Sequence, residues 1–236
     1  MKKVLLGLAL CAFAFASCGD DNKENNGNGN TTSLDATITG NLKIVEWSYN
    51  GYSIQPTIKN ITDEVDEVRG GVYDEPVVLC TAPVSNGQFT LKLPTPSSKY
   101  LNPIGLDYAE EISVSDKNAM GLFFEMFSYK GDEEVGLTYM FPSNLVEETT
   151  VEYIYVDRDV TVKGIETVID EGYKYTLEYN VDFKKGWNTV ILKGSGNKYS
   201  LTTGSIPTGM FWGVETYSLD DLDYTKKTRR FKSFRK

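Results

Sequence analysis

Histidine is absent from all 236 residues of this sequence. Without an imidazole, neither a serine nor a cysteine nucleophile can be activated by the usual histidine base, and zinc sites with histidine ligands are excluded. The sequence also lacks a P-loop and a glycine-rich dinucleotide fingerprint on a strand–helix unit. These absences exclude several common enzyme classes, and they predict a protein without a metal or a cofactor.

Positive charge is scarce as well, because 24 Lys and Arg stand against 33 Asp and Glu, a net charge of −9. This balance argues against nucleic acid as a partner, since phosphate binding needs a basic footprint, and against adsorption to anionic lipid. A basic segment nevertheless ends the chain at residues 226–236, with Lys226, Lys227, Arg229, Arg230, Lys232, Arg235 and Lys236. It can contact an anionic surface or fold back on the acidic body, but its terminal position favours a solvated tail.

The N-terminus begins with Lys2 and Lys3 and continues with thirteen mostly apolar residues, Val4–Ala16. A transmembrane helix needs about 20 residues, so this run is too short to span the hydrocarbon layer. A positive start, a short apolar stretch and small residues such as Ser17 are typical of a secretory signal. Residues 1–17 are therefore predicted to be a signal peptide.

The end of this signal carries a specific motif. Phe15-Ala16-Ser17-Cys18 resembles the lipobox of bacterial lipoproteins, with Phe15 in place of the more usual Leu. The resemblance implies cleavage before Cys18, a lipid on Cys18 and an outer-membrane location. Asp20, Asp21 and Glu24 resemble the acidic export tag of surface-exposed lipoproteins of the Bacteroidetes, which implies display on the cell surface. Acidic residues that only solvate a linker, in a periplasm-facing protein, are the alternative.

Residues 18–33 join this anchor to the rest of the chain. Gly19–Ser33 has no aliphatic or aromatic side chain and is rich in Asn and Gly, which predicts a flexible linker. Cys11 leaves with the signal peptide and Cys18 would be acylated, so Cys80 is the remaining thiol, and neither an internal disulfide nor a four-cysteine metal site can form. Cys80 lies in an apolar run, which predicts a buried small hydrophobe.

From Leu34 onward, apolar and polar residues alternate with a period of two, as in strands with one buried face. The clearest case is Tyr173–Phe183. Asn86-Gly87 is a strong signal for a hairpin turn, and a second hairpin is expected to turn at Asp157-Arg158. Regular strands with short turns predict an all-β fold of one or two antiparallel β-sandwich units.

A composition shift near Leu101–Ser115 divides this region into a first domain, residues 34–105, and a second β domain, residues 106–225. The first resembles small transthyretin-like or Cna-B-like sandwiches in its order up to GQFTLKLPTP. VDRDVTVKG and VDFKKGWNTV resemble phrases of two-part β-rich surface lipoproteins of the Bacteroidetes. This resemblance implies a location and a fold, and it implies no activity.

Aromatic residues offer the most specific lead to a ligand. Trp47 and Tyr49 share a parity, so both point to one side of a strand, and polar residues flank them. A sugar-binding platform would have this composition. Core packing is the alternative, and it is favoured most strongly at Trp187 and Trp212, since tryptophan is largely buried in proteins.

Carboxylates are abundant and leave other classes open. A glycosidase needs only two of them across a cleft, and no local spacing identifies such a pair. Asp157–Asp159 and Asp63–Glu67 offer calcium ligands but match no EF-hand loop, so solvated turns are favoured. The sequence therefore predicts a lipid-anchored surface protein with a non-catalytic binding role. A glycan-binding accessory protein of a surface uptake system, an adhesive or structural module that binds protein, and a carboxylate-dependent hydrolase are the alternatives.

Overall fold

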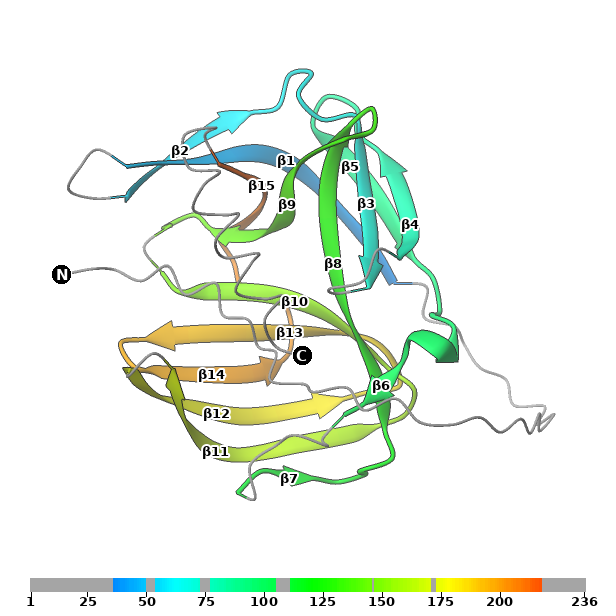
Figure 1. The fold of residues 1–236 in the computed structure, drawn as a ribbon, viewed down its shortest axis with the longest axis vertical. Helices are drawn as coiled ribbons and strands as arrows, with labels where there is room; N and C mark the ends of the chain where they lie inside the picture. The colour runs from blue at the N-terminus through cyan, green and yellow to red at the C-terminus, as the bar shows by residue number, and fades with distance from the viewer. Residues whose placement is uncertain are drawn as a thin grey trace.

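A computed structural model describes residues 36–49, 54–72, 77–104, 111–145, 147–170 and 173–217 (Figure 1). The predicted signal peptide, Cys18, the acidic tag, the linker and the basic segment lie outside these residues. The described elements are β1 Ala36–Tyr49, β2 Ile54–Asn60, β3 Glu67–Val72, β4 Val78–Pro83, β5 Gln88–Leu93, the 3-10 turn η1 Ser98–Tyr100, β6 Asn102–Pro103, β7 Ser113–Val114, β8 Met120–Lys130, β9 Glu133–Pro142, β10 Thr149–Val156, β11 Val160–Asp170, β12 Tyr173–Phe183, β13 Gly186–Ser195, β14 Lys198–Thr203 and β15 Met210–Tyr217. The predicted all-β fold is confirmed.

The strands form one extended sheet in the order β2-β1-β15-β9-β8-β10-β13-β14-β12-β11-β7. Beside this path, β3 pairs with β4 and β8, β5 pairs with β1, and β6 pairs with β8. The sheet is mixed rather than purely antiparallel, because β1 runs parallel to β15 and β12 runs parallel to β14. Strands from both predicted domains thus share one sheet. The predicted boundary after residue 105 falls outside the described residues, and the division into two domains stays a prediction.

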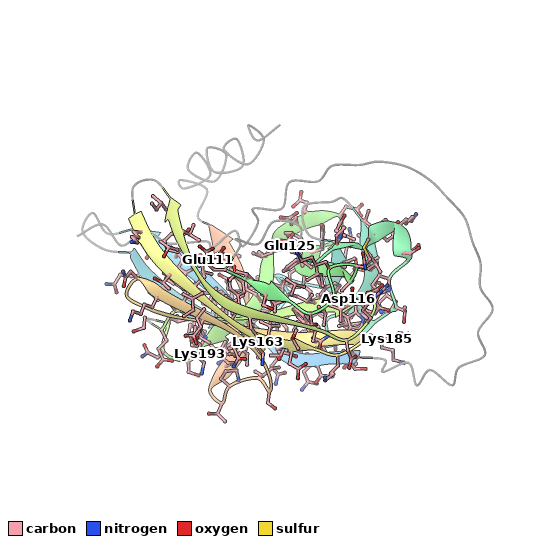
Figure 2. All side chains as sticks on the ribbon, turned by 90° about the horizontal axis from the view of Figure 1, so that it is seen from below. Glu111, Asp116, Glu125, Lys163, Lys185 and Lys193 are labelled. Atoms are coloured by element: carbon pink, nitrogen blue, oxygen red, sulfur yellow. The ribbon has the colours of Figure 1, made fainter. Side chains whose placement is uncertain are left out.

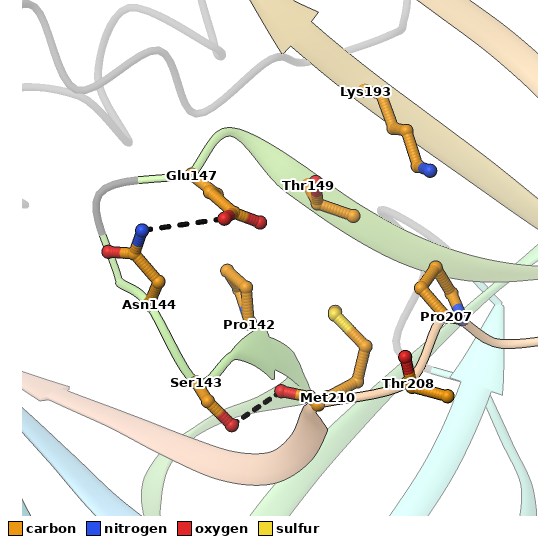
Figure 3. Close-up of a pocket in the computed structure, with 10 residues that line it drawn as sticks. Pro142, Ser143, Asn144, Glu147, Thr149, Lys193, Pro207, Thr208 and Met210 are labelled. Atoms are coloured by element: carbon orange, nitrogen blue, oxygen red, sulfur yellow. Dashed lines mark hydrogen bonds between the residues drawn. The ribbon is translucent and has the colours of Figure 1, made fainter.

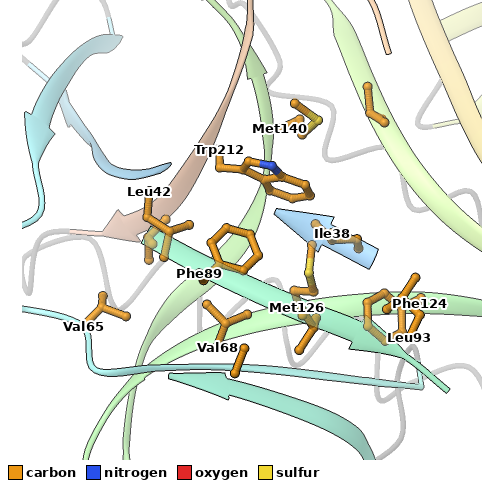
Figure 4. Close-up of a cluster of buried hydrophobic side chains, with 14 of the residues drawn as sticks. Ile38, Leu42, Val65, Val68, Phe89, Leu93, Phe124, Met126, Met140 and Trp212 are labelled. Carbon is orange, nitrogen blue, oxygen red and sulfur yellow. The ribbon is translucent and has the colours of Figure 1, made fainter. Parts of the chain in front are cut away.

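Two hydrophobic clusters lie on opposite sides of this sheet. The first is covered by β3, β4 and β5 and includes Leu42, Val68, Phe89, Met126 and Trp212 (Figure 4). The second lies inside the curved lower sheet and includes residues such as Val162, Leu177, Tyr179, Val190 and Leu201.

Strand β10 separates the two clusters. Its residues Val151 and Tyr155 belong to the first cluster, whereas Ile154 and Val156 belong to the second. Successive side chains of a strand point to opposite faces, so both faces of β10 are covered by packed side chains. The side of the sheet that carries the second cluster is called the inner face below.

Local signals in the sequence are confirmed at two places. Asn86 and Gly87 have φ values of 51° and 76°, which suits the predicted tight turn, and Ser85 bridges to Gln88. The turn joins β4 to β5, which then pair with β3 and β1 respectively. Strand β12 also has the predicted bounds, with Val181 and Phe183 buried.

The hairpin expected at Asp157-Arg158 is wrong, although a turn is present. Strand β10 pairs with β8 and β13, whereas β11 pairs with β12 and β7. The turn is instead bonded to the loop before β8: the Asp157 carboxylate accepts a hydrogen bond from the Met120 N–H at 2.9 Å, and Arg158 lies 3.5 Å from Asp116. These contacts separate the two strands.

Candidate functional site

Glu152 is the most unusual polar group of the inner face. It lies on β10 between Val151 and Tyr153, opposite Val190 of β13, and alternation places it on the same side as Ile154. Burial raises the pKa of its carboxyl to about 7. The residue as a whole is half-buried, whereas its carboxyl lies deep in the molecule. Among the described residues, no group forms a hydrogen bond or ion pair with it.

Thr150 adds a second unsatisfied group beside Glu152. Its hydroxyl is buried and has no hydrogen-bond partner within the described part of the chain. It lies two residues before Glu152 on the same face of β10 and faces Leu192 of β13. Buried polar groups are almost always hydrogen-bonded, so the Thr150 hydroxyl is an exception, and it lies next to a carboxyl whose pKa is raised by burial.

Further carboxylates and tyrosines share the inner face with this pair. Tyr179 donates a hydrogen bond of 2.5 Å to Glu166 between β12 and β11. Tyr199 is hydrogen-bonded to Glu148, and burial together with this carboxylate raises the pKa of Tyr199 to about 12. Tyr175 packs edge-on against Tyr199 with ring centroids 5.9 Å apart. These groups add acceptors and aromatic rings to the same face, and those on β11, β12 and β14 lie two to four strands away from β10.

Glu125 of β8 belongs to the same face. Phe123 of β8 pairs with Ile154 of β10 in an antiparallel register. The same register, continued by two residues, places Glu125 opposite Glu152. Figure 2 shows Glu125 on one side of the curved strands and Lys163 and Lys193 on the other. The set Glu125, Thr150, Glu152, Glu166, Tyr179 and Tyr199 is called the acidic inner face below.

A small hollow of about 250 Å³ lies elsewhere, between the β9–β10 loop and the turn before β15 (Figure 3). Its polar groups are mostly satisfied within the protein. Ser143 donates to the Gly209 carbonyl at 2.6 Å, and the Asn144 amide donates to Glu147 at 3.4 Å. Lys193 also lines it. This hollow therefore offers less chemistry than the acidic inner face.

The structure describes only one side chain, that of Trp47, of the predicted aromatic platform. Trp47 is half-buried on β1, opposite Pro56 of β2, and its indole N–H is buried without a partner among the described residues. Tyr49 is the last residue of β1, and the structure does not describe its side chain. Tyr52 lies outside the described residues altogether. Whether the two rings form a ligand platform stays a prediction.

The other two tryptophans are core residues, as expected. Trp212 is buried, donates to the Thr39 carbonyl at 3.2 Å and packs edge-on against Phe89. Trp187 packs against the first cluster and donates to the Pro94 carbonyl at 2.9 Å. Their indole groups are therefore committed to the fold.

Cys80 is half-buried on β4 rather than fully buried as predicted. Burial raises the pKa of its thiol to about 11, so little of it is thiolate at neutral pH. Its Sγ atom lies 4.0 Å from the Gly70 carbonyl oxygen. The described residues contain no group of three acidic, cysteine or histidine side chains placed to hold a metal, and none of them forms a helix able to cross a membrane.

Sequence reasoning missed Glu152, although a signal was present. The run Val151–Val156, VEYIYV, is apolar on both parities except for this one residue. Such a run is typical of a strand buried on both faces, and a lone acid within it is exceptional.

Identification of the site thus depends on the geometry and chemistry of the acidic inner face. Its defining residues come from β8, β10, β11, β12 and β14, far apart in the chain. No protein-family model, curated protein or solved structure matches this chain.

Proposed function

We propose that the protein is held at the cell surface by a lipid on Cys18 and binds a ligand on the acidic inner face without converting it. The observation that carries this site is the Glu152 carboxyl, which is deeply buried and has no partner among the described residues. A pKa raised from 4.5 to about 7 disfavours its charged form by up to about 3 kcal/mol. Glutamine would fill the same space without this cost. A ligand that pairs with the carboxylate would explain why an acid occupies this position.

The chemistry of the described residues supports binding rather than covalent catalysis. The Cys80 thiol, with a pKa of about 11, is a poor nucleophile at neutral pH. Glu166 is engaged by the Tyr179 hydroxyl, and Tyr199 by Glu148, so these groups form a fixed polar lining. A lining of this kind orients a ligand through hydrogen bonds.

A carboxylate-dependent hydrolase is the second candidate, and Glu152 itself favours it. A general acid needs a pKa raised by burial, and Glu152 has one of about 7. Glu125, on the neighbouring strand β8, is the carboxylate that could supply the second group of a pair, whereas Glu166 lies four strands away on β11. The two candidates differ in their products, because only the hydrolase releases any.

The binding test uses the full chain in detergent, with Glu152→Gln and, as a matched control, Glu178→Gln. Glu178 is an exposed acid on the outer face of β12. Calorimetric titration with neutral polysaccharides, acidic polysaccharides and basic peptides should detect a ligand whose affinity falls at least tenfold in Glu152→Gln only. Mass spectrometry of the same mixtures would detect products. Ligand binding unchanged in Glu152→Gln would refute the site, and product formation would favour the hydrolase.

The anchor and the surface location are tested on cells. Cys18→Ala should abolish cleavage of the signal or release the protein from membranes. Protease added to intact cells should digest the wild-type chain, and replacing Asp20, Asp21 and Glu24 by Asn should protect it. Equal digestion of both chains would refute the export tag while leaving the anchor intact.

A further inference from the structure

On strands β10 to β14, the inner face carries carboxylates that no lysine or arginine of these strands faces. The lysines of β11 to β14 all alternate to the outer face, where they are exposed: Lys163, Lys174, Lys193 and Lys198. Strand β10 has no basic residue. The inner side of these five strands therefore contributes Glu152 and Glu166 without a lysine or arginine between them.

Two groups of β10 have no partner within the described part of the chain, and their chemistry indicates what kind of group would bind them. The Glu152 carboxylate needs a cation, and the Thr150 hydroxyl needs a hydrogen-bond partner. An ammonium or a guanidinium group donates several hydrogen bonds at once, so one such group can serve both. The apolar neighbours Val190 and Leu192 would surround the aliphatic stem of a lysine or arginine.

The chain itself carries a segment of this chemistry within reach. Nineteen residues follow Tyr217, the last residue of β15, and the basic segment 226–236 ends them. The ring of Trp212, in the same strand, stacks on Tyr153 of β10 at 6.2 Å, and both rings belong to the first cluster, on the face of β10 opposite to Glu152. The segment would therefore have to pass round the sheet to the inner face. Nineteen residues can span up to about 60 Å when extended, which is long enough for this path.

We propose that the basic segment 226–236 binds the acidic inner face of its own chain and places a lysine or arginine against Glu152 and Thr150. Seven positive charges meet a face that carries Glu125, Glu152 and Glu166. Because the segment is tethered, its effective concentration at this face is in the millimolar range, so an external ligand must displace it. The segment then acts as an internal competitor for the binding proposed above, on which this consequence rests.

A carbodiimide, which joins carboxylates to amines only when they touch, tests the contact in the full chain. Cleavage before Asp residues yields a C-terminal peptide that begins at Asp223 and keeps its lysines together. We expect this peptide cross-linked to segments that contain Glu152, Glu125 or Glu166. The yield should fall at least fivefold in 1 M NaCl, because exposed ion pairs are screened by salt. Glu152→Gln should remove the Glu152 link, and Glu178→Gln should leave it unchanged.

A second chain, with all seven basic residues of the segment replaced by serine, tests the competition. A free peptide of residues 226–236 should bind this chain at least tenfold more tightly than it binds the wild type, and Glu152→Gln should weaken that binding. Cross-links that are absent, or that reach the outer-face Glu178 as often as Glu152, would overturn the proposal. Equal peptide affinity of the two chains would overturn it as well. Neither result affects the ligand panel above, whose outcome depends on Glu152 and not on the segment.

Discussion

Ser128 of β8 and Thr138 of β9 share a hydrogen bond of 2.7 Å between their hydroxyl groups, and both side chains are fully buried. Ser128→Ala would leave the Thr138 hydroxyl buried without this partner. We expect a loss of about 1–3 kcal/mol in the free energy of unfolding, measured by urea titration. In the double variant Ser128→Ala, Thr138→Val, both hydroxyls are gone, and much of the loss should be recovered. A double variant as unstable as the sum of the two single variants would contradict the pairing.

The parts of the fold that depend on local sequence were predictable. The turn at Asn86-Gly87 needs positive φ at both residues, which these two residue types tolerate best. Strand β12 alternates strictly over its whole length, so its bounds and buried face followed from the pattern. Both features are encoded within a dozen residues.

Strand pairing was not predictable in the same way. Strand β1 pairs in parallel with β15, almost the whole chain away, and β14 lies between β12 and β13 although it follows both. The expected β10–β11 hairpin failed because the Asp157 carboxylate bonds Met120 instead of supporting a ladder. Such contacts join residues that are distant in sequence, and no local pattern encodes them.

The candidate site could not be predicted from the sequence for the same reason. Glu152 matters because both faces of β10 are covered, and this depends on which strands flank it. Trp47 was chosen from its neighbours in sequence, and the structure finds it half-buried. A functional carboxylate in a central strand is recognisable only once the pairing of that strand is known.

Gly40 is required by the ring of Trp212. A Cβ atom at Gly40 would lie 2.0 Å from Trp212 Cδ1, well inside van der Waals contact, and that ring is fixed by Phe89 and the Thr39 carbonyl. Gly40→Ala should therefore destabilise the protein by about 1–3 kcal/mol or more in thermal unfolding. Gly204→Ala is the control, because its nearest neighbour, Ile191, would lie at an ordinary 3.8 Å. Equal melting temperatures for the two variants would contradict this packing.

Cys80 should react slowly with iodoacetamide. A thiol pKa of about 11 leaves roughly a thousandth of the groups as thiolate at pH 8, against about a tenth for a thiol of pKa 9. We expect alkylation of the native protein to be about 100-fold slower than that of the same protein in guanidinium chloride, measured by mass spectrometry of the Cys80 peptide. Native and unfolded rates that agree would mean that the thiol is fully accessible.

Cys80→Ser should cost little more stability than Cys80→Ala, since the half-buried serine hydroxyl would lie near the Gly70 carbonyl oxygen. A fully buried small hydrophobe would instead tolerate alanine much better than serine. Urea titration of the two variants distinguishes these cases, because an unpartnered buried hydroxyl costs about 1–3 kcal/mol.

Trp47 can be tested for packing and for binding with two variants. Trp47→Phe removes the buried indole N–H, which has no partner in the part of the chain that the structure describes, and keeps an aromatic ring, so stability should be unchanged or slightly higher. Trp47→Ala removes the ring, and its half-buried position predicts a loss below the 3–5 kcal/mol typical of a core tryptophan. If Trp47 and Tyr49 form a glycan platform, Trp47→Ala should also abolish retention on a polysaccharide gel. Retention that survives Trp47→Ala would remove the glycan platform.

Glu152 should make the protein less stable as the pH rises whenever no cation pairs with its carboxylate. Its carboxyl has a pKa near 4.5 in the unfolded chain and about 7 in the folded one, so between these values the folded state binds more protons. The free energy of unfolding is therefore highest, as far as Glu152 is concerned, below pH 4.5, where the carboxyl is protonated in both states. It decreases progressively as the pH rises to about 7. The loss amounts to at most about 3 kcal/mol, less in proportion to the exposure of the residue.

Glu152→Gln removes this dependence, because glutamine stays neutral. The comparison is made in a chain whose seven basic residues in segment 226–236 are replaced by serine, so that no internal cation pairs with Glu152. In this background the variant should match the wild-type residue at pH 4.5 and unfold several degrees higher at pH 8, measured by calorimetry across this range without added ligand. Glu178→Gln, on the exposed outer face of β12, should follow the wild-type curve at every pH. A difference between Glu152→Gln and the wild type that is the same at pH 4.5 and pH 8 would mean that the carboxyl does not titrate in this range. If the Glu152→Gln protein is more stable and no longer binds the ligand, the cost of burying this acid is retained for binding.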